Sequence, residues 1–265
     1  MFEKILLMSD LHLTEPSQMI VGLCPKTRFE ACLDHAALHH PDARHLFLMG
    51  DLAHHGLELE YEILTDILKT VPFRTTLMLG NHDRRSNFLA VFPKKPQKFQ
   101  QGYLDIGRTR VVYLDTLNEI ASNKHSGLLC QERVDWLTDT LERSPFPVVV
   151  LAHHHMLPSG FDGMDQIMLK NSEVVASILA DSGKCQMVVN GHIHRVIFGQ
   201  IQGVPHAMIK SPCHQMPMVL GAGDSSLSVD EPGGYGVLLL DGRTPILHHV
   251  DVGLRIYDMA QDPSS

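Results

Sequence analysis

The sequence predicts an α/β protein in which β-sheets pack face to face and helices lie on their outer sides. Short aliphatic runs recur along the chain, as buried strands do. Segments with a helical spacing of apolar residues separate several of these runs in the first half, whereas later runs follow one another without helices. The chain is 44% hydrophobic and 20% charged, which suffices for a large core and excludes a disordered or collagen-like chain.

Eight short runs of aliphatic or β-branched residues are expected to be strands. They are 5–8, 46–49, 75–79, 110–114, 148–151, 187–189, 207–209 and 237–240. Helices are expected at 61–68, 134–141 and 174–179, where apolar residues recur at intervals of three and four. Two stretches that lack such patterns, 93–102 and 221–234, are expected to be surface loops because they are rich in Gly, Pro or polar residues.

The chain length favours one domain. Its 265 residues amount to fewer than two typical domains of roughly 150 residues, and neither an internal repeat nor a boundary is visible. We expect a single domain over 1–265, with 221–265 as a C-terminal extension of strand and loop.

Charge and cysteine usage exclude several classes of protein. The 22 Lys and Arg against 30 Asp and Glu give a net charge of −8, which disfavours nucleic acid as a partner. No apolar run approaches the ~20 residues of a membrane helix, and the amino end lacks a signal-peptide core. Five scattered cysteines without a C-x-x-C pair indicate neither a disulfide framework nor a cysteine zinc site. These features favour the cytoplasm.

Polar residues that can bind metal follow five of the expected strands. The candidate ligands are Asp10, His12, Asp51, Asn81, His153, His192 and His194. Each short motif alone is weak, because such residues also occur in ordinary turns. Together they can meet where open α/β sheets place their functional loops. Mixed carboxylate, amide and imidazole ligands suit Mn, Fe, Zn or Co, and seven ligands exceed the four that one structural zinc ion needs.

Glycines precede several of these candidates. Gly50, Gly80 and Gly191 stand directly before a motif, where a Cβ atom could obstruct a tight exit from the strand. Ordinary turn glycines are the alternative interpretation.

The five blocks, spanning residues 8–194, resemble the calcineurin-like metallophosphoesterase superfamily. They are Asp10-x-His12, Gly50-Asp51, Gly80-Asn81-His82-Asp83, His153 and Gly191-His192-x-His194. Within the superfamily the chain is similar to bacterial glycerophosphodiester phosphodiesterases and class III cyclic-nucleotide phosphodiesterases, through segments such as 114–116, 157–160 and 213–215. The resemblance implies a four-layer αββα sandwich of two mixed sheets flanked by helices, with a dinuclear metal centre.

The resemblance also implies residue roles. It assigns Asp10, His12 and His194 to one ion, Asn81, His153 and His192 to the other, Asp51 to the bridge, His82 to catalysis at the phosphate and His214 to the substrate. The chain departs from its relatives at two places. His155 and Met156 stand where relatives have proline, which leaves His154 as an alternative ligand to the favoured His153, and His54 stands where relatives tend to carry Asp or Asn.

The other histidines have less defined expectations. For His54, His55 and His125 two interpretations stay open. They either contact the metal ligands or the substrate from neighbouring loops, or they have no role in the site. Histidines outside every block are expected at the partly exposed surface: His35, His39, His40, His45, His248 and His249.

The function implied by the resemblance is hydrolysis of a small phosphodiester, a glycerophosphodiester or 3′,5′-cyclic nucleotide, by metal-activated hydroxide. Two divalent transition-metal ions are the implied cofactors, and His82 acts as acid or transition-state stabiliser. The loops at 116–127 and 158–165 are expected to contact the alcohol groups. Alternatives are a phosphomonoesterase, a phosphonate-ester hydrolase and a non-catalytic scaffold. The expected partner is a small molecule, without nucleic acid or membrane, and a homodimer or larger homo-oligomer is allowed.

Overall fold

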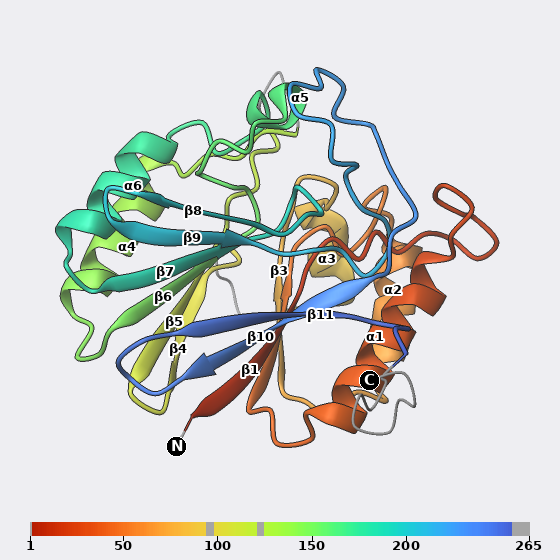
Figure 1. The fold of residues 1–265 in the computed structure, drawn as a ribbon, viewed down its shortest axis with the longest axis horizontal. Helices are drawn as coiled ribbons and strands as arrows, with labels where there is room; N and C mark the ends of the chain where they lie inside the picture. Colours follow the sequence, from red (N-terminus) through yellow and green to blue (C-terminus); the bar gives the residue numbers. More distant parts are fainter. Residues whose placement is uncertain (1, 94–97, 121–124, 256–265) are drawn as a thin grey trace, which may run out of the picture.

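Two mixed β-sheets form the centre of the molecule in the computed structural model, which describes residues 2–93, 98–120 and 125–255 (Figure 1). The first sheet has the order β11-β10-β1-β2-β3. Its strands are β1 (Glu3–Met8), β2 (His45–Met49), β3 (Thr75–Met78), β10 (Gly234–Leu240) and β11 (Ile246–Asp251). The second sheet has the order β4-β5-β6-β7-β9-β8. Its strands are β4 (Gly102–Ile106), β5 (Thr109–Leu114), β6 (Val148–Ala152), β7 (Cys185–Asn190), β8 (Ile197–Ile201) and β9 (Val204–Met208).

Helices cover the outer face of each sheet. The first sheet packs against α1 (Pro25–His39), α2 (Glu58–Leu68) and α3 (Arg85–Val91). The second packs against α4 (Gln131–Glu142) and α6 (Ser172–Asp181), while the short α5 (Asp162–Asp165) lies in a loop region beyond the strand ends (Figure 1). The expected αββα sandwich is therefore confirmed. Within the described residues, no helix is long and apolar enough to cross a membrane.

Alternate side chains of each buried strand point to opposite faces of its sheet, and so form two layers of the core. Ile5 and Leu7 of β1 belong to a cluster that also contains Val149 of β6, so this cluster lies between the sheets. Leu6 and Met8, the alternate residues of β1, instead pack with residues of α1 and α2. A strand whose side chains are buried on both faces appears in the sequence as a continuous apolar run, which is why β1, β2 and β6 were predicted correctly.

Three strands missed in the sequence are all edge strands. β4, β8 and β11 each pair with only one neighbour, and most of their residues are half-buried or exposed. Half-exposed edge strands tolerate polar residues, so they lack the aliphatic run by which the others were found. The expected helices 61–68, 134–141 and 174–179 correspond to α2, α4 and α6, whereas α1 and α3 were also missed.

The C-terminal part of the chain contributes to the first sheet. β10 pairs antiparallel with β1 and lies between β1 and β11, so the expected extension over 221–265 supplies two strands of the sandwich. The expected loop 221–234 has little regular structure. The expected loop 93–102 lies partly outside the described residues, at 94–97, and Gly102 begins β4.

Candidate metal centre

The site lies where loops from both sheets meet. β1, β2 and β3 are parallel and end at the same edge of the first sheet, as β6 and β7 do in the second. Backbone hydrogen bonds tie the first two loops together, since Asp10 N–H donates to Gly50 O and His12 N–H donates to Asp51 O. His153, directly after β6, donates from Nδ1 to Met49 O at the end of β2, which joins the two sheets at the site.

The seven residues expected to bind metal converge in this place. His194 Nε2 lies 3.1 Å from His12 Nε2 and 3.2 Å from Asp10 Oδ1. His153 Nε2 lies 3.1 Å from Asn81 Oδ1. A single oxygen, Asp51 Oδ2, lies 3.7 Å from His12 Nε2 and 3.4 Å from His153 Nε2. His192 completes the set and donates its backbone N–H to the Asp10 carboxylate. The Asp51 carboxylate thus faces both groups of side chains.

The backbone is strained at most of these positions. Eight described non-glycine residues have a positive φ, and five of them belong to the expected ligand set. These five are Asp10 (60°), His12 (48°), Asp51 (48°), His192 (73°) and His194 (55°). Such conformations cost on the order of 1–3 kcal/mol each and cluster at functional sites. The strain therefore indicates that the loops are shaped for the site and not for local stability.

Close packing explains the glycines that precede the ligands. A Cβ atom at Gly80 would overlap Asp51 Oδ1, and one at Gly191 would overlap Ser9 Oγ. The expectation that side chains would obstruct these turns is confirmed.

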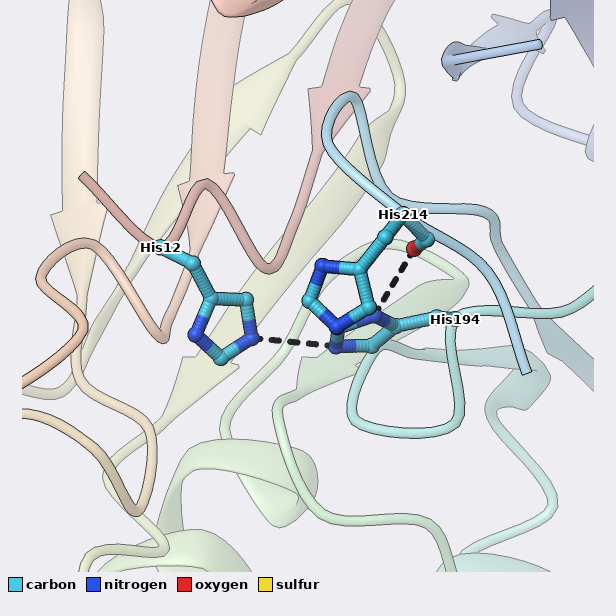
Figure 2. A group of neighbouring side chains, drawn as sticks. All are labelled: His12, His194 and His214. Atoms are coloured by element: carbon cyan, nitrogen blue, oxygen red, sulfur yellow. Dashed lines mark hydrogen bonds between the residues drawn. The ribbon is translucent and has the colours of Figure 1, made fainter. Parts of the chain in front are cut away.

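The ring nitrogens turned away from the centre have acceptors. His194 Nδ1–H donates to His214 O (2.9 Å; Figure 2), as His153 Nδ1–H donates to Met49 O (3.0 Å). His12 Nδ1 lies 3.2 Å from His54 Nδ1. These contacts orient each ring so that Nε2 points inward, as is usual for histidines that bind a metal.

The donor set fits a bound cation. The buried His192 Nε2 finds no hydrogen-bond partner among the described residues. Burial lowers the pKa of His153, but the Asp51 and Asp10 carboxylates outweigh it and raise that pKa to about 9. Burial also opposes protonation of His194, whose pKa is nevertheless raised by Asp10. Two buried carboxylates that attract positive charge, beside imidazoles whose Nε2 atoms lie close together, can hold divalent ions of the borderline class.

His154, the alternative to His153, packs edge-on against the His153 ring at a centroid distance of 5.0 Å. Its Nδ1 lies 2.7 Å from Thr116 Oγ1, and its buried Nε2 lacks a hydrogen-bond partner among the described residues. Nitrogens of His153, His154 and His192 lie within 4.8 Å of one another. His153 alone of the pair also contacts Asn81 and Asp51, so the geometry favours it over His154 as the ligand.

The rings of His82 and His214 flank that of His12, at centroid distances of 4.7 and 5.3 Å. His82 donates its backbone N–H to Asp51 Oδ1 (2.8 Å) and its ring Nδ1–H to His54 O (2.8 Å). The His214 ring lies with its centroid 4.6 Å from that of His194 (Figure 2). Burial, with a smaller effect of His194, lowers the pKa of His214 to about 3, so its ring is neutral.

Two residues that position the site were not recognised from the sequence. The buried Asp83 accepts backbone N–H groups of Gly80 (2.8 Å), Leu52 and Ala53, and thereby fixes the loops after β2 and β3 together. Its only signal was its place at the end of the Gly-Asn-His-Asp block. His54 was left open, and the structure places it against both His12 and His82, on whose ring it stacks at a centroid distance of 5.3 Å.

A cavity of about 380 Å³ opens beside the cluster. His125 and Met164 line it, consistent with the expected loops 116–127 and 158–165, although 121–124 lie outside the described residues. Segments 20–21 and 225–228 also line it, so the stretch 221–234 is not only a surface loop, as expected, but part of this wall. The volume suits a small molecule.

A family model described as calcineurin-like phosphoesterase matches residues 3–196, which include all seven expected ligands. The chain belongs to this family. The membership confirms the predicted superfamily and the predicted hydrolase of phosphoesters. It also agrees with the Asp and His groups described above, because metallophosphoesterases use a dimetal centre.

Relatives and solved structures extend the comparison. The chain is 32% identical, over 92% of its length and 91% of the relative's, to a probable cyclic nucleotide phosphodiesterase of Rhodopseudomonas palustris. It is 26% identical, over 80% of its length and 77% of the relative's, to the 3′,5′-cyclic adenosine monophosphate phosphodiesterase CpdA of Haemophilus influenzae. A dimetal phosphatase from Danio rerio shares the fold, with a TM-score of 0.70 at 12% identity over 93% of this chain and 95% of the other.

Proposed function

We propose that this calcineurin-like phosphoesterase is a dimetal phosphodiesterase that hydrolyses 3′,5′-cyclic nucleotides. The observation that carries the proposal is the position of Asp51 Oδ2, which faces His12 Nε2 on one side and His153 Nε2 on the other. A carboxylate oxygen between two groups of ligands is what a bridged pair of ions requires.

The contacts support the ligand assignment that the resemblance implies. Asp10, His12 and His194 would hold one ion, and Asn81, His153 and His192 would hold the other, with Asp51 shared. Bound there, two divalent ions of Mn, Fe, Zn or Co would supply a nucleophilic hydroxide at neutral pH and neutralise charge on the phosphoryl oxygens.

His82 is the proposed catalytic residue. Because its Nδ1–H donates to His54 O, Nε2 is the nitrogen that can meet the substrate in the cavity. A proton on Nε2 can pass to the oxygen of the leaving alcohol, or stabilise charge that develops on the phosphate. The backbone bond from His82 to Asp51 keeps this ring at a constant position relative to the centre.

The cavity supports a nucleotide over a glycerophosphodiester. Besides the histidines and the polar Ser225, Ser226 and Ser228, its lining contains apolar side chains, namely Ile20, Val21, Met164, Ile167, Ile193, Met216 and Leu227. A planar nucleobase buries more apolar surface against these side chains than glycerol does. The names of the relatives from R. palustris and H. influenzae agree with this choice.

A substrate panel on metal-loaded protein tests the proposal. After chelation and reconstitution with Mn²⁺, elemental analysis should give about two ions per chain. Cyclic AMP should be hydrolysed with a higher kcat/KM than glycerophosphoethanolamine, and both diesters faster than the monoester AMP. One ion or fewer at saturation contradicts the dimetal centre, and monoester preference contradicts the diesterase. Two bound ions without hydrolysis of any ester would indicate a scaffold.

His214→Ala is expected to raise KM for cyclic AMP by about 2- to 12-fold, the equivalent of one hydrogen bond of about 0.5–1.5 kcal/mol. The reason is that the neutral His214 ring lines the cavity beside His194 and can bond a diester oxygen. Metal content should stay at the wild-type value. The control is His248→Ala on β11, which is exposed. Loss of an ion from the His214 variant would show that this residue is a ligand instead, as its distance from His12 and His194 allows.

A further inference from the structure

A strained two-residue turn in the loop between β1 and α1 lies at the cavity, and Ile20 and Val21 of this turn line it. Ile20 and Leu23 pair as in a hairpin, with Ile20 N–H donating to Leu23 O (2.9 Å) and Leu23 N–H donating to Ile20 O (2.8 Å). The residues between them, Val21 and Gly22, have φ values of 46° and 80°. A turn with positive φ at both central positions is of type I′, which strongly prefers Asn-Gly.

Valine is poorly suited to this position. A β-branched residue at positive φ is a genuine outlier, because its side chain crowds the backbone there. The side chain is also 54% exposed, so burial in the core does not compensate for the strain. Strain that persists without a packing reason points to function.

The position of Val21 at the cavity indicates what that function is. Val21 and Ile20 line the same cavity as His82, His194 and His214. The turn therefore places apolar surface in the cavity that also contains the proposed catalytic His82, the proposed metal ligand His194 and the proposed substrate contact His214. An asparagine in its place would satisfy the backbone and present an amide to the cavity.

We propose that Val21 determines specificity, by giving the cavity an apolar contact for a flat, weakly polar group carried by the alcohol part of the substrate, such as the base of a nucleoside. This inference rests on the proposed function, since it concerns the substrate of that site. Ile20 continues the contact, and the hairpin bonds hold both residues in position.

The chain contains a matched control for the turn. Gln202 and Gly203 join β8 to β9 with φ values of 49° and 82°, and the flanking Ile201 and Val204 pair as Ile20 and Leu23 do. Gln202 is exposed and does not line the cavity. Val21→Asn and Gln202→Asn thus create the same Asn-Gly turn, inside and outside the site.

Steady-state kinetics of Mn²⁺-loaded protein test the proposal. We expect Val21→Asn to raise Tm, because asparagine tolerates this φ, yet to lower kcat/KM for cyclic AMP by about 10-fold. For glycerophosphoethanolamine the change should stay below about 2-fold, since that substrate lacks a flat apolar group. Gln202→Asn should leave both values unchanged. Val21→Ile keeps the apolar contact and should retain cyclic AMP hydrolysis within about 3-fold.

Two results would overturn the role of Val21. One is a Val21→Asn protein with wild-type kcat/KM for cyclic AMP, and the other is an equal loss on both diesters. If wild-type protein hydrolyses no cyclic nucleotide, the proposed function fails separately. In that case the Val21→Asn protein is compared with wild type on bis(p-nitrophenyl) phosphate, whose aromatic rings offer a similar flat surface. An unchanged kcat/KM for this ester, or a loss equal to that on glycerophosphoethanolamine, would overturn the role of Val21.

Discussion

Asp51→Asn is expected to abolish metal binding and hydrolysis together. The substitution removes the charge that faces both ligand groups, yet Oδ1 can still accept the His82 backbone N–H, so the loop is preserved. Two adjacent cations without the shared carboxylate repel each other. Replacing a residue that only hydrogen-bonds a metal ligand typically lowers metal affinity by about 10- to 100-fold. Asp51 is itself a proposed ligand, so its replacement should lower Mn²⁺ affinity, and activity with it, by more than about 100-fold.

Calorimetric titration with Mn²⁺ and kcat/KM for cyclic AMP measure the two effects. Asp115→Asn is the matched control: Asp115 is equally buried but pairs with Arg85 (2.6 Å), away from the cluster. That variant should be less stable and still bind Mn²⁺ as wild type does. Full Mn²⁺ binding by the Asp51 variant would show that Asp51 does not bridge.

His82→Ala is expected to have the second largest effect, a 10²- to 10⁴-fold loss of kcat with both ions retained. His82 bonds to the centre through its backbone N–H to Asp51, which alanine preserves, and its ring packs edge-on against that of His12 at a centroid distance of 4.7 Å. The side chain that is removed lines the cavity and can reach the substrate. The loss should therefore fall on turnover and not on metal content.

Leaving groups of different basicity reveal which role His82 has. An acid is needed most for the basic alkoxide that cyclic AMP releases, and least for p-nitrophenolate. A general acid thus predicts a larger loss on cyclic AMP than on bis(p-nitrophenyl) phosphate, whereas a transition-state stabiliser predicts similar losses. His45→Ala, at the opposite end of β2, should leave both rates unchanged. Wild-type kcat of the His82 variant on cyclic AMP would contradict both roles.

The residues that meet at the site could be found in the sequence because each expected ligand lies within a few residues of the end of a strand. Parallel strands end at one edge of a sheet, so Asp10, Asp51 and Asn81 come together once β1, β2 and β3 pair as neighbours. Their number and chemistry indicated metal binding. The roles of the individual ligands stay a prediction until metal binding is measured.

The sequence by itself determined the α/β class, the buried strands and the residues that converge, because periodicity and strand ends are local properties, while the resemblance of its motifs implied the αββα sandwich. Tertiary structure decided the rest. Contacts such as His192 to Asp10, 182 residues apart, depend on how two sheets pack. The same packing selected His153 over His154, set His54 against His12 and turned Val21 toward the cavity. No local pattern encodes these contacts, since each joins loops whose mutual position is set only when the core between the sheets is formed.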